Sequence, residues 1–189
     1  RFHVQKLAFE ALQEMRVKAR WEALDKESIQ IAYAKACGKI YHAPTFENGD
    51  SRKQLLARSI YLLYKKESLW TESQRIRAGI LFREYPDLKK AYYLSMRLGL
   101  IYHQCKHKDT ALTRLARWYD EVEKSGFLAF GRVIRSIQTH YLEIVNFFDR
   151  RSTNAASESF NAKIKDFRTQ FRGVKDRTFF LFRLTKIYA

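Results

Sequence analysis

The chain has 189 residues, of which 46% are hydrophobic and 15% aromatic, and it contains only 7 glycines and 2 prolines. This is the composition of a globular protein with few helix-breaking residues, and it favours an all-α fold. The 36 Lys and Arg residues against 20 Asp and Glu residues give a net charge of +16, which favours a polyanionic partner. No stretch approaches the ~18 apolar residues of a membrane span, so we expect nucleic acid and no membrane.

The first part of the chain predicts a long helix, a loop and a second helix. Apolar residues recur at intervals of three and four from Phe2 towards Gly38, which predicts one long helix or two helices joined near Asp25. The segment 40–50 contains a proline and the sequence Asn-Gly-Asp, so it predicts a loop. A helix over residues 51–66 is expected to follow.

The remainder of the first 150 residues predicts four further helices. Thr71 can cap a helix that Pro86 ends, and Asp87 can begin the next one. A helix over 109–124 is followed by a serine and a glycine, a typical stop signal. A helix over 128–148 completes this region.

Three tryptophans are candidates for contact with a nucleic-acid base. Core packing is the ordinary prediction for Trp21 and Trp118. Trp70 lies in a predicted loop before a capping residue, so it is the tryptophan to test for stacking on a base.

The cysteines do not predict a metal site. Cys37 and Cys105 are far apart in the sequence, and we expect two reduced, mostly buried thiols in a cytoplasmic protein. His103 and His107 share a helix face, but Cys105 points away from that face, so we expect no zinc there. The amino end lacks both a signal peptide and an initiator Met, and we expect the chain to be a fragment.

The stretch "STNAASESFNAKIKDF", residues 152–167, predicts a helix with two different faces. One face carries the apolar residues Phe160, Ile164, Phe167 and Phe171, and the other carries Asn154, Glu158, Asn161 and Lys165. A helix buried on one face can hold a metal-binding carboxylate in place. The alternative is that Glu158 lies near the first helical turn, where the helix dipole and a nearby base stabilise it.

This pattern resembles a known catalytic signature. It comprises Thr153-Asn154, Glu158, Asn161 and Ile164-Lys165. It resembles the carboxy-terminal signature of bacterial insertion-sequence transposases of the ISL-three family, in which the glutamate is the last acid of a DDE triad. The start, "RFHVQKLAFEALQEMR", resembles the segment that follows the second catalytic aspartate in this family.

The resemblance implies a domain organisation. Two internal stretches, "RSIYLLYKKESLWTESQ" and "YPDLKKAYYLSMRLGLIY", resemble the helical insertion that separates the second aspartate from the glutamate. Residues 1–148 would then form an α-helical insertion domain. Residues 149–189 would be the terminal helices of an RNase H-like catalytic core whose sheet is missing from this fragment.

The resemblance also implies a chemistry. The intact protein would catalyse metal-dependent DNA cleavage and strand transfer with two Mg²⁺ or Mn²⁺ ions, and Glu158 would be both a catalytic residue and a metal ligand. The fragment alone would be inactive and bind no metal tightly, because both catalytic aspartates would lie before Arg1. The expected DNA contacts are Arg151, Asn154, Asn161, Lys165, Arg168 and Arg172.

Two other functions are left open by the sequence. The chain could be a non-catalytic DNA-binding module, which would tolerate the loss of Glu158. It could also be a helical protein-interaction module, which would form a homo-oligomer through the insertion and lack the steep salt dependence of phosphate binding.

Overall fold

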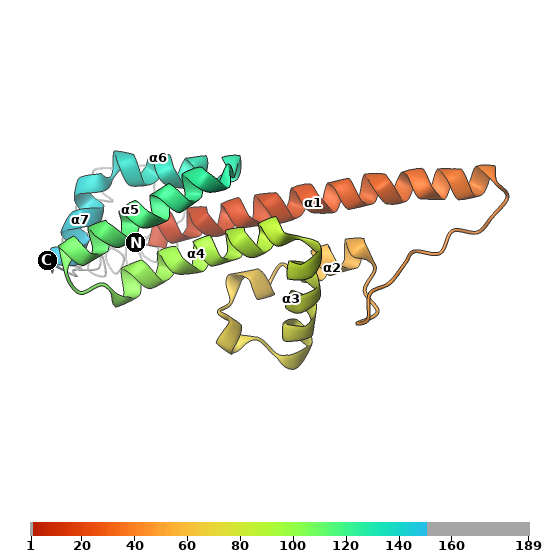
Figure 1. The fold of residues 1–189 in the computed structure, drawn as a ribbon, viewed down its shortest axis with the longest axis horizontal. Helices are drawn as coiled ribbons and strands as arrows, with labels where there is room; N and C mark the ends of the chain where they lie inside the picture. Colours follow the sequence, from red (N-terminus) through yellow and green to blue (C-terminus); the bar gives the residue numbers. More distant parts are fainter. Residues whose placement is uncertain (1, 151–189) are drawn as a thin grey trace, which may run out of the picture. The chain divides into compact units, whose positions relative to one another are not determined.

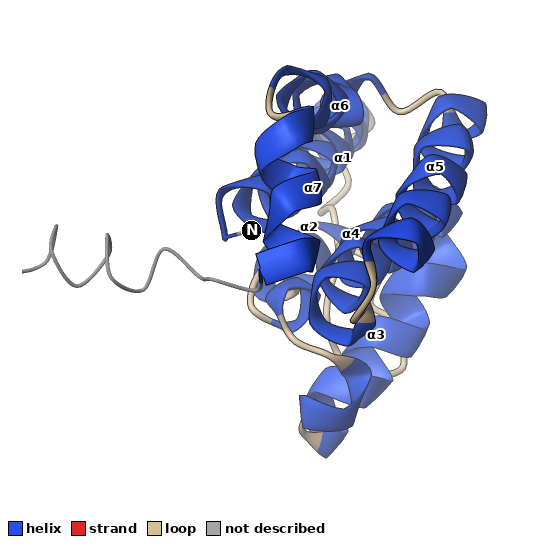
Figure 2. Ribbon diagram, turned by 90° about the vertical axis from the view of Figure 1, so that its left-hand side faces the viewer, coloured by secondary structure: helices blue, strands red, loops and turns tan. Residues whose placement is uncertain are grey.

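The computed structural model describes residues 2–150, and every regular element in this range is a helix (Figures 1 and 2). The α-helices are α1 (Phe2–Ala36), α2 (Arg52–Arg58), α3 (Glu72–Glu84), α4 (Pro86–Gln104), α5 (Lys108–Ser125), α6 (Gly131–Thr139) and α7 (Tyr141–Arg150). The 3-10 turns are η1 (Leu62–Tyr64), η2 (Glu67–Leu69) and η3 (Leu128–Phe130). The all-α prediction is confirmed.

The chain divides into two compact units, Arg1–Asp149 and Arg150–Ala189. The helices belong to the first unit, apart from the last residue of α7. The interpretation of residues 1–148 as an insertion and of 149–189 as part of a catalytic core stays a prediction.

Helices α1 and α4 pack closely because small side chains line their contact. Ala8 on α1 is fully buried, and α4 presents Ala91, Ser95 and Gly99 at intervals of four residues. The Ser95 hydroxyl donates a hydrogen bond to the carbonyl oxygen of Ala8 at 3.1 Å. A Cβ atom at Gly99 would lie 3.0 Å from Oε1 of Gln5 on α1. The two helices therefore lie close enough for a side chain of α4 to contact the backbone of α1 directly.

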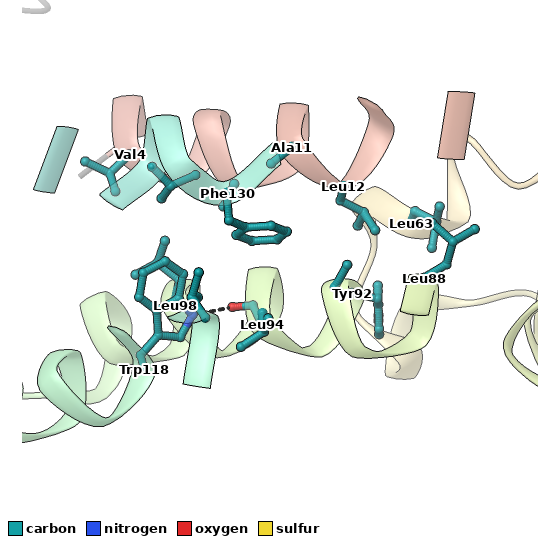
Figure 3. Close-up of a cluster of buried hydrophobic side chains, with 14 of the residues drawn as sticks. Val4, Ala11, Leu12, Leu63, Leu88, Tyr92, Leu94, Leu98, Trp118 and Phe130 are labelled. Carbon is teal, nitrogen blue, oxygen red and sulfur yellow. Dashed lines mark hydrogen bonds between the residues drawn. The ribbon is translucent and has the colours of Figure 1, made fainter. Parts of the chain in front are cut away.

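Larger apolar side chains fill the spaces on either side of this contact (Figure 3). Leu12 from α1 and Leu98 from α4 are fully buried, and Phe130 closes the core from η3. Trp118 on α5 is 1% exposed, and its indole Nε1 donates a hydrogen bond to the carbonyl oxygen of Leu94 at 2.8 Å. The prediction that Trp118 belongs to the core is confirmed.

Local sequence signals end and begin several helices as predicted. Thr71 caps α3 through a reciprocal pair of hydrogen bonds with Gln74. Pro86 is the first residue of α4, where its missing N–H costs nothing. Gly126 ends α5 with φ of 68°, and Gly38, with φ of 66°, follows the single long helix α1.

The predicted helix over residues 51–66 is wrong after Arg58, where α2 ends. Beyond this point, side-chain groups donate hydrogen bonds to three of the backbone carbonyl oxygens. In a longer helix, backbone N–H groups would bind these oxygens instead. The bonds are Gln13 Nε2 to the Ile60 oxygen (3.2 Å), Trp70 Nε1 to the Leu62 oxygen (2.8 Å) and the Tyr92 hydroxyl to the Lys65 oxygen (2.8 Å). These tertiary bonds hold residues 59–70 as turns.

The predicted helix over residues 128–148 is divided into η3, α6 and α7. The break lies at His140, whose φ of −108° and ψ of 30° depart from helical values. After the break, α7 places Phe148 in a stacked contact with Tyr102 of α4, with 5.5 Å between the ring centroids. Burial of these two rings favours the change of direction over one continuous helix.

The contrast between two tryptophans gives a test of this core. We expect Trp118→Phe to lower the free energy of unfolding by about 1–3 kcal/mol, because it removes a buried hydrogen bond and leaves a cavity. The matched change Trp21→Phe, at a side chain that is 61% exposed, should shift it by less than about 0.5 kcal/mol. Urea unfolding followed by far-ultraviolet circular dichroism measures both, and equal losses would contradict the described core.

Candidate functional site

The residues predicted to act on metal and DNA all lie outside the described residues. They are Glu158 for the metal, and Arg151, Asn154, Asn161, Lys165, Arg168 and Arg172 for DNA. The apolar face predicted for the same helix lies there as well. These assignments stay predictions.

Residues 2–150 contain no group of three His, Cys, Asp or Glu side chains that could hold a metal ion. Cys105 is buried, as expected, but Cys37 is exposed, so the prediction of a buried thiol is wrong for Cys37. The reason is that Cys37 lies just beyond the end of α1, where the chain leaves the helix and the residues on both sides are exposed.

The structure excludes the base-stacking alternative for Trp70 and contradicts the core prediction for Trp21. Trp70 is 9% exposed and packs against the rings of Phe82 and Tyr92, at centroid distances of 6.1 and 5.6 Å. It is a core residue and is not available for stacking on a base. Trp21 is 61% exposed on α1, where core packing was expected. The periodicity of α1 predicts the helix, but it does not show that the neighbouring helices cover only part of its length.

Asp50 is a buried ionic centre that sequence reasoning missed. Its side chain is fully buried between the guanidinium groups of Arg58 on α2 and Arg77 on α3, with 2.8 Å from Arg77 Nε to Asp50 Oδ2. Asn48 also donates to its carboxylate, at 2.9 Å. Burial alone would raise the pKa of the Asp50 carboxyl, but hydrogen bonds from Arg77 and Arg58 lower it below its ordinary value. Asp50 therefore joins the loop after α1 to α2 and α3.

The sequence held a signal for the turn and the helix start at Asp50, but none for its ion pairs. Asp50 follows Asn48 and Gly49, and Gly49 has φ of 80°, as a tight turn requires. Ser51 then caps α2, and its backbone N–H donates to Gln54 Oε1 at 2.8 Å. The burial of Asp50 comes from its contacts with Arg58 and Arg77, which the local sequence does not reveal.

Other arginines of the described unit also pair with acids of the same unit. These pairs are Arg52 with Glu84, Arg75 with Glu72, Arg83 with Glu47, Arg97 with Glu121, and Arg132 with Glu14. Each pair neutralises a cation within the chain, so it reduces what that arginine can offer to phosphate. The segment 151–189 differs in composition, because it carries nine Lys and Arg residues against three acids.

Among residues 2–150, no helix has both the length and the apolar character that crossing a bilayer requires. The described part is thus a basic, all-α unit with a buried ionic centre, and the segment that follows it in the sequence carries an isolated glutamate among bases. These features define the class: a basic, all-α protein whose charge favours a polyanionic partner.

The family match is more specific than the class. The model of the ISL3 family of DDE transposases, described as "Transposase", matches residues 1–184. The chain belongs to this family, and the resemblance inferred from its sequence is confirmed. No curated protein and no solved structure matches the chain.

The buried position of Asp50 gives a second test. Asp50→Asn leaves Arg77, which is only 16% exposed, without an anionic partner, and we expect a loss of roughly 3 kcal/mol in unfolding free energy at pH 7. The folded state lowers the pKa of Asp50, so its ion pairs stabilise the fold fully at pH values above the ordinary aspartate pKa of about 3.9. This stabilisation is lost as the pH falls through the folded-state pKa. The difference between the parent and variant should therefore shrink below about pH 4.

The matched control is Glu121→Gln, which removes the acid of the exposed pair with Arg97. It should cost less than about 1 kcal/mol, because solvent screens exposed pairs. Chemical unfolding at several pH values measures both variants. A pH-independent difference for Asp50→Asn would refute its role as a buried carboxylate.

Proposed function

We propose that the transposase to which this chain belongs catalyses metal-dependent DNA cleavage and strand transfer, with Glu158 as the last acid of its active site. One observation carries the proposal. The family match extends over residues 1–184 and includes the signature Thr153-Asn154, Glu158, Asn161 and Ile164-Lys165.

The donor chemistry of the signature fits a hard divalent cation. A Glu158 carboxylate supplies the oxygen ligand that Mg²⁺ or Mn²⁺ prefers, and Asn161 lies three residues away, on the same predicted helix face. The chemistry supplied by two such ions is in-line displacement at phosphorus. By the resemblance, the other two acids would lie before Arg1. Two aspartates from the full-length protein would complete the ligand set.

The role of Glu158 in this proposal is to hold negative charge at a fixed position. A helix that buries its apolar face would orient the carboxylate, and Asn161 could position it through its amide. The exposed acids of the described helices, such as Glu123 and Glu143, have no corresponding signature.

DNA contact by residues 151–189 is the second part of the proposal. Arg151 precedes the signature, and Lys165, Arg168 and Arg172 extend from it, so cations lie on both sides of Glu158 in the sequence. The excess of nine bases over three acids in this segment supports the proposal. Many arginines of the described unit are already paired with acids, which also favours residues 151–189 as the DNA-binding segment.

Substitution of the glutamate tests the catalytic proposal. In the full-length transposase, we expect Glu158→Gln to reduce cleavage and strand transfer by about 10³-fold or more, because a neutral amide cannot balance the charge of the metal ions. DNA binding should be retained, since glutamine preserves the shape and helix propensity of glutamate. Cleavage of DNA that carries the element's ends, measured with Mg²⁺ or Mn²⁺, is the readout.

Two controls accompany this assay. Glu123→Gln and Glu143→Gln remove exposed acids of α5 and α7 and should leave cleavage within about twofold of the parent. The 189-residue chain alone should not cleave, because it would lack the other two acids. Full activity of Glu158→Gln would show that Glu158 is not one of the acids on which cleavage depends.

The salt dependence of binding tests the DNA-contact proposal. Each phosphate contact contributes about 0.9 to the slope of log affinity against log salt, so Arg168→Ala should reduce the slope by about that amount. Arg75→Ala is the matched control, because Arg75 is exposed on α3 and pairs with Glu72 at 2.9 Å. Filter-binding titrations of duplex DNA measure both slopes. Equal slopes for the two variants would place the phosphate contacts elsewhere.

A further inference from the structure

The distal part of α1, residues 21–36, together with the segment 37–40, forms an arm that projects beyond α2 (Figure 1). Sixteen helical residues at about 1.5 Å each make this part of α1 roughly 24 Å long. From Ser28 to Ile40 every residue except Ala34 is exposed. The arm is nevertheless rich in large apolar side chains, of which Trp21 is 61%, Ile29 69%, Tyr33 73% and Ile40 83% exposed.

One face of the arm is already occupied by the loop that returns from it. Ala23 is buried, Glu27 pairs with Lys53 at 2.9 Å, and Gln30 accepts a hydrogen bond from the hydroxyl of Tyr41 at 3.0 Å. Residues 23, 27 and 30 share one face at helical spacing. This contact fixes how the helix is turned, so the opposite face points away from the described unit.

The opposite face carries the pattern of a helix-pairing seam. Its positions, at alternating intervals of four and three residues, are Glu22, Asp25, Ile29, Ala32 and Ala36, and Trp21 and Tyr33 flank them. Small side chains at residues 32 and 36 allow a second helix to approach closely. Ile29 lies at the centre of this series, and two acids, Glu22 and Asp25, occupy its first positions. The exposed side chains of Trp21, Ile29 and Tyr33 give this face a large apolar surface, which is typical of an interaction site.

Charge indicates the nature of the partner. Residues 21–40 carry three bases and three acids, whereas the whole chain carries a net charge of +16. A neutral arm has no electrostatic attraction for DNA phosphates. It is also a place where two copies of a strongly basic chain can meet without bringing like charges together.

We propose that the arm is a self-association surface, on which α1 of a second copy packs antiparallel with Ile29 on the two-fold axis. In this register, Tyr33 of one copy lies opposite Asp25 of the partner subunit, and a phenol can donate a hydrogen bond to a carboxylate. The pairing gives Asp25, the seam acid nearer to the axis, a hydrogen-bond partner, and it buries the isoleucine pair. Two 16-residue faces bury less than about 1,200 Å², so the arm alone supports a weak, concentration-dependent contact.

Ile29 and Ile31 provide a matched pair of sites for the test. Both are exposed on the arm, but they lie two residues apart, so they point to opposite sides of the helix. In the full-length transposase, Ile29→Lys should weaken dimerisation by about 100-fold, because each dimer would place two lysines on its axis. Ile31→Lys should leave dimerisation unchanged. Sedimentation velocity over a concentration series is the measurement, with circular dichroism to confirm that both variants fold.

Cross-linking tests the orientation directly. In a Cys37→Ser background, Ile29→Cys should form a disulfide-linked dimer on oxidation, because the two sulfurs would meet at the axis. Ile31→Cys should not. Neither result depends on the active site, and Glu158→Gln should sediment like the parent protein.

Three outcomes would overturn the proposal. They are a parent protein that stays monomeric at all concentrations, an Ile29→Lys variant that sediments like the parent, and equal cross-linking of the two cysteine variants. Loss of DNA binding in Trp21→Ala with unchanged sedimentation would identify the arm as a nucleic-acid contact instead.

Discussion

The close contact between α1 and α4 is the constraint on which the rest of the described unit depends. Ala8, Ala91 and Ser95 are fully buried in it, and the backbone of α4 accepts a hydrogen bond from Gln5 of α1 at 3.0 Å. The remaining helices attach to one of these two. Helices α2 and α6 and the turn η3 contact α1, whereas α3 and α5 contact α4. The pair therefore acts as a common support, and ion pairs of Arg52, Arg58 and Arg77 also join α2 and its preceding loop to α3.

A second constraint comes from side chains that bond backbone carbonyls across the fold. Between α2 and α3, donors from α1, α4 and the turn at Trp70 bond carbonyl oxygens that a longer helix would otherwise use. Such bonds satisfy the backbone in the interior without regular structure. They also place Trp70 and Tyr92 against each other, so the irregular segment is part of the core.

Helix ends that depend on neighbouring residues in the sequence were predicted correctly. Helix ends and burial that depend on contacts with distant parts of the fold were not. Thr71, Pro86 and Gly126 act through their own backbone and near neighbours, so their roles could be predicted. Trp21 and Trp70 could not be placed, because a tryptophan's burial depends on which other helix reaches it. Helical periodicity predicts that α1 is a helix, but it does not show where the neighbouring helices end.

The candidate site divides in the same way. Glu158 was predicted from a motif. A motif indicates which residue types act together, but it does not give their positions in space, so the role of Glu158 stays a prediction. Asp50 was not predicted, because its importance arises from two arginines that are 8 and 27 residues away in the sequence. A buried carboxylate between two guanidinium groups is recognised only when the helices that carry them are known to converge.

The total charge of +16 is less informative than its distribution. In the described unit, surface arginines and acids lie within pairing distance, so much of the positive charge is balanced locally. The arm at residues 21–40 is neutral, and the segment 151–189 has three times as many bases as acids. The net charge per residue is therefore higher in the segment that also carries the glutamate signature, which supports the proposed DNA contact there. Because the neutral arm adds little to that attraction, its exposed isoleucine and aromatic side chains are better explained by contact with protein.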